Sequence, residues 1–131
     1  KGTSGTLDGV ALALPALMRS EKLIKRVKRA GYELAQPDKL IERLQDKLEQ
    51  KHSPAKDIDQ ESQNENWVGE LFFMLNLLAV HLGVDTEKAL RITNRKFENE
   101  VINFEKYGTN EQIQFFSTKL FNFLFKKRIK L

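Results

Sequence analysis

The chain has 131 residues, of which 40% are hydrophobic and 31% are charged, and this suits one globular domain with a single core. It has no cysteine, which excludes disulfides and thiolate metal sites, and no apolar run approaches the roughly 20 residues of a membrane-spanning helix. Since the N-terminus also lacks the pattern of a signal peptide, we expect a cytoplasmic protein.

The formal net charge of +4 is unevenly distributed along the chain. One basic cluster falls in the first predicted helix and consists of Arg19, Lys22, Lys25, Arg26, Lys28 and Arg29. A second lies near the C-terminus and consists of Lys126, Lys127, Arg128 and Lys130. Basic clusters attract phosphates, nucleic acid or anionic lipid, and they also occur as solvated helix faces, so both interpretations stay open.

Two helices are predicted in the first part of the chain. Residues 1–10 contain three glycines and predict a loose loop. Apolar residues at helical spacing then predict a helix that begins near Ala11 and ends at Gly31. A second helix opens at Pro37 and Asp38, where an aspartate can cap the first turn.

A polar segment separates this pair from two further helices. Residues 51–66 contain one large apolar side chain, Ile58, and predict a mobile linker. The segment 67–82 is apolar nearly all round, which is typical of a central helix, and Gly83 can end it. A fourth helix is expected over residues 86–107.

The end of the chain, residues 109–131, predicts a basic and aromatic C-terminal helix. Its phenylalanine stripe could pack within the domain or across a dimer, lie on an anionic membrane, or bind nucleic acid. No β-alternation persists anywhere, so the predicted class is all-α. We expect residues 1–131 to form one bundle of four or five helices, with the second and third as an antiparallel pair.

Carboxylates at helical spacing suggest a metal site. Glu42, Asp46 and Glu49 stand at i, i+4 and i+7 and therefore share one face of the second helix. On the third helix Glu70 shares a face with Trp67. Magnesium prefers oxygen ligands and is often held by a few carboxylates together with substrate phosphates. The same spacing also fits an acidic surface stripe, so periodicity alone leaves both possibilities.

Several segments carry a resemblance to a known family. They are residues 14–19 (LPALMR), 69–73 (GELFF), 76–85 (NLLAVHLGVD) and 88–98 (KALRITNRKFE). Over residues 6 to about 105 the chain resembles the MazG family of nucleoside triphosphate pyrophosphohydrolases, and most closely the C-terminal of the two domains in the longer members. The resemblance implies an all-helical homodimer that uses Mg²⁺ to cleave a nucleoside triphosphate into the monophosphate and pyrophosphate.

The metal-binding motifs of that family are altered in this sequence. Where the family has two adjacent glutamates followed three positions later by a third, this chain has Glu42, Arg43 and Asp46. The partner motif, Glu-x-x-Asp, is replaced by Trp67 and Glu70. By transfer from the family, Asp46 and Glu70 are the two metal ligands that remain, while Arg43 and Trp67 stand in place of the other two.

The resemblance also implies the remaining roles. Lys22, Asn94 and Lys96 match polar residues that the family places around the substrate phosphates.

The positive charge of Arg43 opposes a metal ion at this place. A divalent cation about 4 Å from Arg43 would be repelled by about 8 kcal/mol at an effective dielectric constant near 20. We therefore formulate the hypothesis that the Arg43 guanidinium replaces the metal and bridges Asp46 and Glu70.

Three functions compete on this basis. The first is a pyrophosphohydrolase of weak or lost activity, in which Glu42, Asp46 and Glu70 form the catalytic set. The second is a non-catalytic relative that binds nucleotide or a partner through its basic first helix. The third is a dimerisation or regulatory domain.

Overall fold

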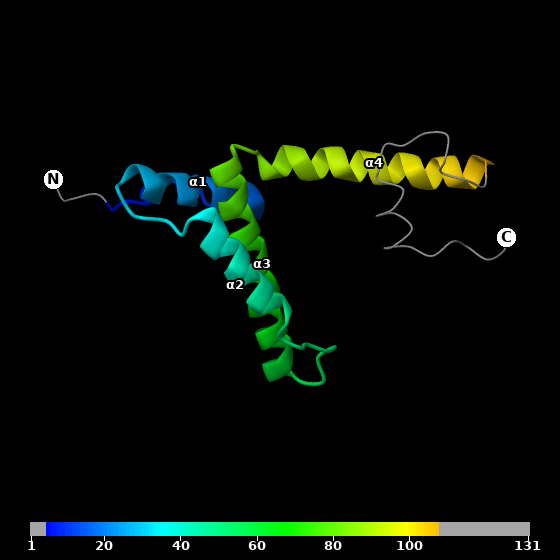
Figure 1. Ribbon diagram of the computed structural model, residues 1–131, viewed down its shortest axis with the longest axis horizontal. Helices are drawn as coiled ribbons and strands as arrows, with labels where there is room; N and C mark the ends of the chain where they lie inside the picture. The colour runs from blue at the N-terminus through cyan, green and yellow to red at the C-terminus, as the bar shows by residue number, and fades with distance from the viewer. Residues whose placement is uncertain (1–4, 108–131) are drawn as a thin grey trace. The chain divides into compact units, whose positions relative to one another are not determined.

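The computed structural model describes residues 5–107, which form four α-helices and no strand (Figure 1). The helices are α1 (Ala16–Arg29), α2 (Pro37–Leu48), α3 (Ile58–Leu82) and α4 (Thr86–Tyr107). The predicted all-α class is confirmed. The predicted C-terminal helix over residues 109–131 lies outside the described residues.

The chain divides into two compact units, Lys1–Thr86 and Glu87–Leu131. The first contains α1, α2 and α3, and the second contains nearly all of α4, a helix of 22 residues. A single domain over residues 1–131 stays a prediction. In the described part of the chain no single helix is long and apolar enough to cross a membrane, although α3 and α4 meet that criterion of length and composition when taken together.

The helix α1 begins later than predicted, at Ala16 instead of near Ala11. The reason is Pro15, which takes the N-cap position with φ −54° and ψ 146° and disfavours a helical conformation in the residue before it. The other end agrees with the prediction. Gly31 has a φ of +96°, and the amide of Tyr32 donates to the carbonyl of Val27 at 3.1 Å, which closes the helix in a Schellman arrangement.

The core of the first unit forms where α1, α2 and α3 meet. Ile24 of α1, Leu40 of α2 and Leu77 of α3 are buried together. Partly buried side chains packed around them are Leu34, Met74, Leu78 and Val80. Since each helix contributes one apolar stripe, the opposite faces remain available to solvent.

Beside this core lies Asn76, which is 1% exposed and forms a hydrogen bond through each of its two side-chain polar atoms. Its amide donates to the Leu17 carbonyl at 2.9 Å, and its side-chain oxygen accepts from the Thr86 hydroxyl at 2.8 Å. A buried polar group without partners would be destabilising, so this pair of hydrogen bonds fixes α1 and the end of the first unit to α3.

The helices α2 and α3 form the predicted antiparallel pair, visible as the cyan and green helices of Figure 1. Near the end of α2, the Trp67 indole N–H donates to the carbonyl of Lys47 at 2.9 Å. Just before the start of α2, the Ala35 carbonyl lies 2.7 Å from the Nε2 atom of His81, near the end of α3. The beginning of α3 therefore lies beside the end of α2.

The helix α3 begins at Ile58, so the prediction of a mobile linker over residues 51–66 is wrong for its second half. Asp57 caps the helix, because its carboxylate accepts a hydrogen bond from the Gln60 amide at 2.8 Å. The side chain of Asn64 donates to the Ser53 carbonyl at 2.9 Å and ties the preceding loop to the helix. The polar residues 58–66 therefore form the capped, largely solvent-exposed first turns of α3.

Candidate functional site

A groove of about 570 Å³ runs between α2 and α3. It is lined by Arg43 and Lys47 of α2 and by Glu65, Asn66, Gly69, Glu70, Phe73 and Met74 of α3. Two cations and two carboxylates balance each other along its walls, and a phenylalanine and a methionine supply apolar surface. The volume lies in the range of ligand-binding clefts.

The closest charged contact in this groove joins Lys47 and Glu70. The Lys47 ammonium lies 2.5 Å from one Glu70 carboxylate oxygen, and the Asn66 amide donates to the other at 3.3 Å. The hydrogen bond and the positive charge of Lys47 hold the pKa of Glu70 below its ordinary value, with a smaller contribution from Asn66. Glu70 is thus an ionised carboxylate that already has a cation.

Trp67 has a structural role beside the C-terminal end of α2. Its indole donates to the Lys47 carbonyl, one of the last four carbonyls of α2, which have no partner within the helix. The ring of His52 stacks on the indole, with centroids 4.1 Å apart and planes 18° apart. The residue that stands in place of a family carboxylate therefore holds the loop and the end of α2 against α3.

The hypothesis that Arg43 bridges Asp46 and Glu70 is wrong. Arg43 does line the groove with Glu70, but no ion pair within 4.0 Å joins it to either carboxylate among the described residues. The cation on Glu70 is Lys47. Both Arg43 and Asp46 are exposed, and Asp46 is not among the residues that line the groove.

Helix geometry explains why the acids of α2 do not converge with Glu70. With about 100° of rotation per residue, Asp46 lies about 120° around α2 from the buried Leu40, and Glu42 lies about 160° around. These acids therefore belong to the outer side of α2. Glu42 pairs there with Lys39 at 3.9 Å, and both side chains are well exposed.

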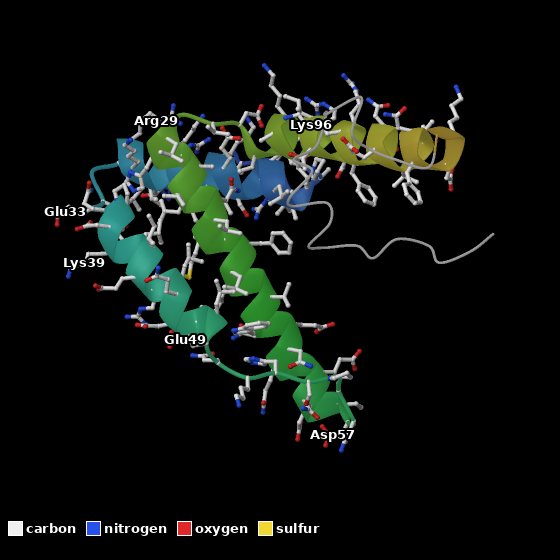
Figure 2. The ribbon with its side chains drawn as sticks, turned by 45° about the vertical axis from the view of Figure 1, so that its right-hand side comes forward. Arg29, Glu33, Lys39, Glu49, Asp57 and Lys96 are labelled. Carbon is white, nitrogen blue, oxygen red and sulfur yellow. The ribbon has the colours of Figure 1, made fainter. Side chains whose placement is uncertain are left out.

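The predicted phosphate-binding residues fall in different parts of the molecule. Lys22 lies on α1 and is exposed, outside the α2–α3 groove. Asn94 and Lys96 are exposed residues of α4, in the second unit (Figure 2). Their roles stay predictions.

Lys47 was missed by sequence reasoning, although the sequence carried a signal. It stands seven residues after Leu40 and three after Leu44, so it continues the apolar stripe of α2 toward α3. Its side chain is only 18% exposed. A lysine on the buried stripe of an amphipathic helix needs a carboxylate on the neighbouring helix, and Glu70 supplies it.

The carboxylates of the groove do not fit a magnesium ion. Glu70 is engaged by Lys47, and Asp46 lies outside the groove lining. Within residues 5–107 no group of three or more histidine or carboxylate side chains is placed to hold a metal ion. A magnesium ion needs near-octahedral oxygen coordination. The positive charges of the Lys47 ammonium and the Arg43 guanidinium in this groove would repel it.

The described part of the chain is all-helical, with a groove of mixed charge between two antiparallel helices. The chain is similar to two curated relatives, both named nucleoside triphosphate pyrophosphohydrolase, one from Escherichia coli strain K12 and one from Escherichia coli O157:H7. Each is 31% identical to this chain over 108 residues, which cover 81% of the chain and 41% of the relative. No family model matches the chain.

The predicted relationship is confirmed: the chain is a homologue of the nucleoside triphosphate pyrophosphohydrolases of the MazG family. It spans about two fifths of the length of the curated relatives that it matches.

Proposed function

We propose that this chain is a nucleotide-binding domain of the nucleoside triphosphate pyrophosphohydrolase type in which metal-dependent cleavage is weak or lost. The observation that carries the proposal is the ion pair between Lys47 and Glu70 at 2.5 Å. It neutralises a carboxylate that the family motif would assign to the metal, and it does so from the buried stripe of α2. A nucleoside triphosphate is the ligand that the kinship with the curated relatives supports.

The groove between α2 and α3 is the proposed nucleotide site. Arg43 is exposed at its wall with no carboxylate partner among the described residues, and a guanidinium suits two oxygens of one phosphate. Phe73 and Met74 offer apolar surface to a base. The wall is open at Gly69, because a Cβ added there would meet no heavy atom within 4 Å.

The proposal is tested by measuring binding and cleavage separately. A panel of nucleoside triphosphates is titrated into the full chain, and pyrophosphate release is followed with Mg²⁺ and with Mn²⁺. We expect binding with little or no release. Efficient Mg²⁺-dependent release by the unmodified chain would contradict the proposal, and absence of binding to every triphosphate would contradict it as well.

Restoring the carboxylates gives a second test. The combined variant Arg43→Glu, Trp67→Glu and Lys47→Gln returns two acids and frees Glu70 from its ammonium partner. It should bind Mn²⁺ more tightly than the unmodified chain, as measured by calorimetry, and should gain pyrophosphate release. Lys39→Gln, which removes an exposed lysine on the outer side of α2, is the matched control and should do neither.

A dimerisation or regulatory domain is the second candidate, and an apolar stripe on α3 favours it. Val68, Phe72 and Leu75 stand at i, i+4 and i+7 and are 42%, 52% and 50% exposed. We propose a homodimer built on this stripe. If a nucleoside triphosphate raises the melting temperature, the chain acts as a nucleotide-binding domain. If the melting temperature stays the same and the chain is dimeric, the dimerisation or regulatory domain replaces the nucleotide-binding domain as the proposed function.

A further inference from the structure

The α2–α3 groove contains two cations, and Glu70 already occupies one of them. Arg43 and Lys47 stand four residues apart on α2, and both line the groove. Among the described residues no ion pair within 4.0 Å joins Arg43 to a carboxylate, whereas the Lys47 ammonium lies 2.5 Å from a Glu70 oxygen. An anionic ligand that reaches Arg43 therefore meets the Glu70 carboxylate at the next cation.

The two partners of this ion pair differ in their freedom to move. The Lys47 side chain is 18% exposed and continues the apolar stripe of Leu40 and Leu44, so its ammonium stays at the groove. The Glu70 side chain is 49% exposed. A side chain that is half in water can change its rotamer within nanoseconds and is hydrated in its new position. Glu70 is therefore the partner that can leave.

The donors that hold Glu70 are of the kind that a phosphate group uses. The Lys47 ammonium contacts one carboxylate oxygen, and the amide of Asn66, one turn earlier on α3, donates to the other at 3.3 Å. Ammonium and amide groups donate to phosphate oxygens in the same way. The carboxylate thus holds a place at which a phosphate oxygen would accept the same hydrogen bonds.

A purely structural role for the ion pair is the alternative, and the packing gives little need for it. The backbone of Lys47 is already joined to α3, because its carbonyl accepts a hydrogen bond from the Trp67 indole at 2.9 Å. Leu40 and Leu77 hold the two helices together in the core. An ion pair with a half-exposed partner adds little to these contacts. Its position in the groove, by contrast, bears directly on the charge that a ligand meets.

We propose that Glu70 is an internal competitor of the ligand: its carboxylate occupies Lys47 in the free chain, and a phosphate group of the nucleoside triphosphate takes its place in the complex. The inference rests on the proposed function and adds the regulation of the same groove. Lys47, on the buried stripe of α2, keeps an anionic partner in both states. Because the ligand exchanges one charge-assisted contact for another at Lys47, Glu70 lowers the affinity of the groove for anions.

The main test is Glu70→Gln, which keeps the size of the side chain and removes its charge. ATP, GTP, CTP and UTP are titrated into the full chain and into this variant by calorimetry, with EDTA present so that no divalent ion bridges the carboxylates. The Kd of the nucleotide that the chain binds best should fall about tenfold, since Lys47 is then free for a phosphate. An unchanged or higher Kd in Glu70→Gln would overturn the proposal.

The matched control is Glu65→Gln, which removes the same charge from the same groove. Among the described residues no ion pair within 4.0 Å joins Glu65 to Lys47, so this substitution should lower the Kd by a clearly smaller factor. Equal decreases in the two variants would mean that Glu70 acts only through its overall negative charge, and they would contradict a competition for Lys47.

A double-mutant cycle isolates the part that depends on Lys47. In Lys47→Gln the competitor has no ammonium to occupy, so the addition of Glu70→Gln should lower the Kd no more than Glu65→Gln does. A decrease of about tenfold that persists without Lys47 would contradict the proposal. If Glu70→Gln reduces the helical circular dichroism, Glu70→Asp replaces it. This shorter carboxylate reaches Lys47 less well and should lower the Kd by a smaller factor, and no decrease would overturn the proposal.

Carbon NMR of the Glu70 carboxyl gives a readout that a merely structural ion pair would not change. In the free chain Lys47 holds the pKa of Glu70 below its ordinary value. When a phosphate takes Lys47, the pKa of Glu70 should rise, because its cation is lost and a second anion lies nearby. The same pKa in the free chain and in the saturated complex would show that no exchange takes place.

Failure of this proposal is distinguishable from failure of the proposed function. If the unmodified chain binds a nucleoside triphosphate and Glu70→Gln binds it no more tightly, the proposed function stands and Glu70 is not a competitor. If only Glu70→Gln binds, the competition is supported and the proposed function fails for the unmodified chain. If neither binds any of the four nucleotides, both proposals fail.

Discussion

Lys47 and Glu70 connect the charge of the groove to the pH dependence of stability. Because Lys47 lowers the pKa of Glu70 in the folded chain, folding is favoured while this carboxylate is ionised. The contribution of this ion pair to the stability of the folded chain is fully present above the pKa of Glu70 in the unfolded chain. It is lost as the pH falls through the lower pKa of the folded chain.

Replacing Lys47 by methionine should remove that dependence. In Lys47→Met the pKa of Glu70 should rise toward its ordinary value, because both its hydrogen bond and its charge partner are gone. Carbon NMR of the Glu70 carboxyl would measure this change. The loss of unfolding free energy between about pH 7 and pH 3 should be smaller than in the unmodified chain.

The control for this prediction is Lys39→Met. Lys39 belongs to an exposed pair with Glu42 on the outer side of α2, so its removal should leave the titration of Glu70 unchanged. A Glu70 titration that is the same in Lys47→Met as in the unmodified chain would contradict the role given to the ion pair.

At the level of residues, the contact between Lys47 and Glu70 was not predicted from the sequence. The sequence indicated that Glu70 belongs to a family motif, and the spacing of Leu40 and Leu44 indicated the buried stripe of α2. It did not reveal that Lys47 would extend far enough to reach Glu70, because the reach of a long side chain depends on the axial register of two helices. That register is set by tertiary contacts such as the one between Trp67 and Lys47.

At the level of elements, the start of α3 depends on Asp57. Its carboxylate satisfies the Gln60 amide, one of the four donors at a helix start that have no partner within the helix. Asp57→Ala should lower the free energy of unfolding by about 1 kcal/mol in urea denaturation. Hydrogen exchange of the amides in the first turn should also become faster.

Gln63→Ala is a suitable comparison for this cap, because Gln63 is exposed in the second turn of α3 and has no capping contact. It should change the free energy of unfolding by no more than about 0.5 kcal/mol. If Asp57→Ala were as mild as Gln63→Ala, the cap would not be what starts the helix at Ile58.

Gly69 allows a prediction in the opposite direction. A glycine inside a helix costs about 0.5–1 kcal/mol relative to alanine, and no heavy atom lies within 4 Å of the place where a Cβ would be added. Gly69→Ala should therefore stabilise the chain by roughly that amount. The added methyl group would enter the proposed nucleotide groove, so the affinity for nucleoside triphosphates should fall.

Ser62→Ala separates the two effects of that substitution. Ser62 is exposed on α3 outside the groove, so alanine there changes helix propensity alone. Nucleotide affinity should stay as it is in the unmodified chain. Equal nucleotide affinity in Gly69→Ala and Ser62→Ala would mean that the ligand does not approach this part of the groove.

The helices themselves were largely predictable from sequence, and their boundaries were less so. Gly31 and Gly83 mark helix ends that the structure confirms, with φ values of +96° and +72° that favour glycine. The beginning of α3 was hidden, because its first turns carry polar residues on all sides and resemble a linker in composition. Side-chain contacts such as the hydrogen bond from the Gln60 amide to Asp57 distinguish the capped helix start from a linker.

At the level of the whole molecule, the described core is small compared with the apolar surface that remains exposed. Its buried hydrophobic residues are Val10, Ile24, Leu40, Leu44, Leu77 and Ala79. By contrast, the stripe of Val68, Phe72 and Leu75 on α3 is about half exposed. Monomeric proteins rarely leave contiguous apolar patches of this kind uncovered, and a second copy of the chain would bury it.

The homodimer is tested by Phe72→Glu, which puts a charge in the middle of this stripe. If two copies meet there, the substitution introduces two carboxylates into an apolar interface, and burying them without partners is costly. Sedimentation equilibrium should therefore give a dimer for the unmodified chain and a monomer for Phe72→Glu. Leu12→Glu, at a leucine that is 85% exposed in the N-terminal loop, should remain dimeric. A monomeric unmodified chain, or a dimer that survives Phe72→Glu, would show that α3 is not the contact between subunits.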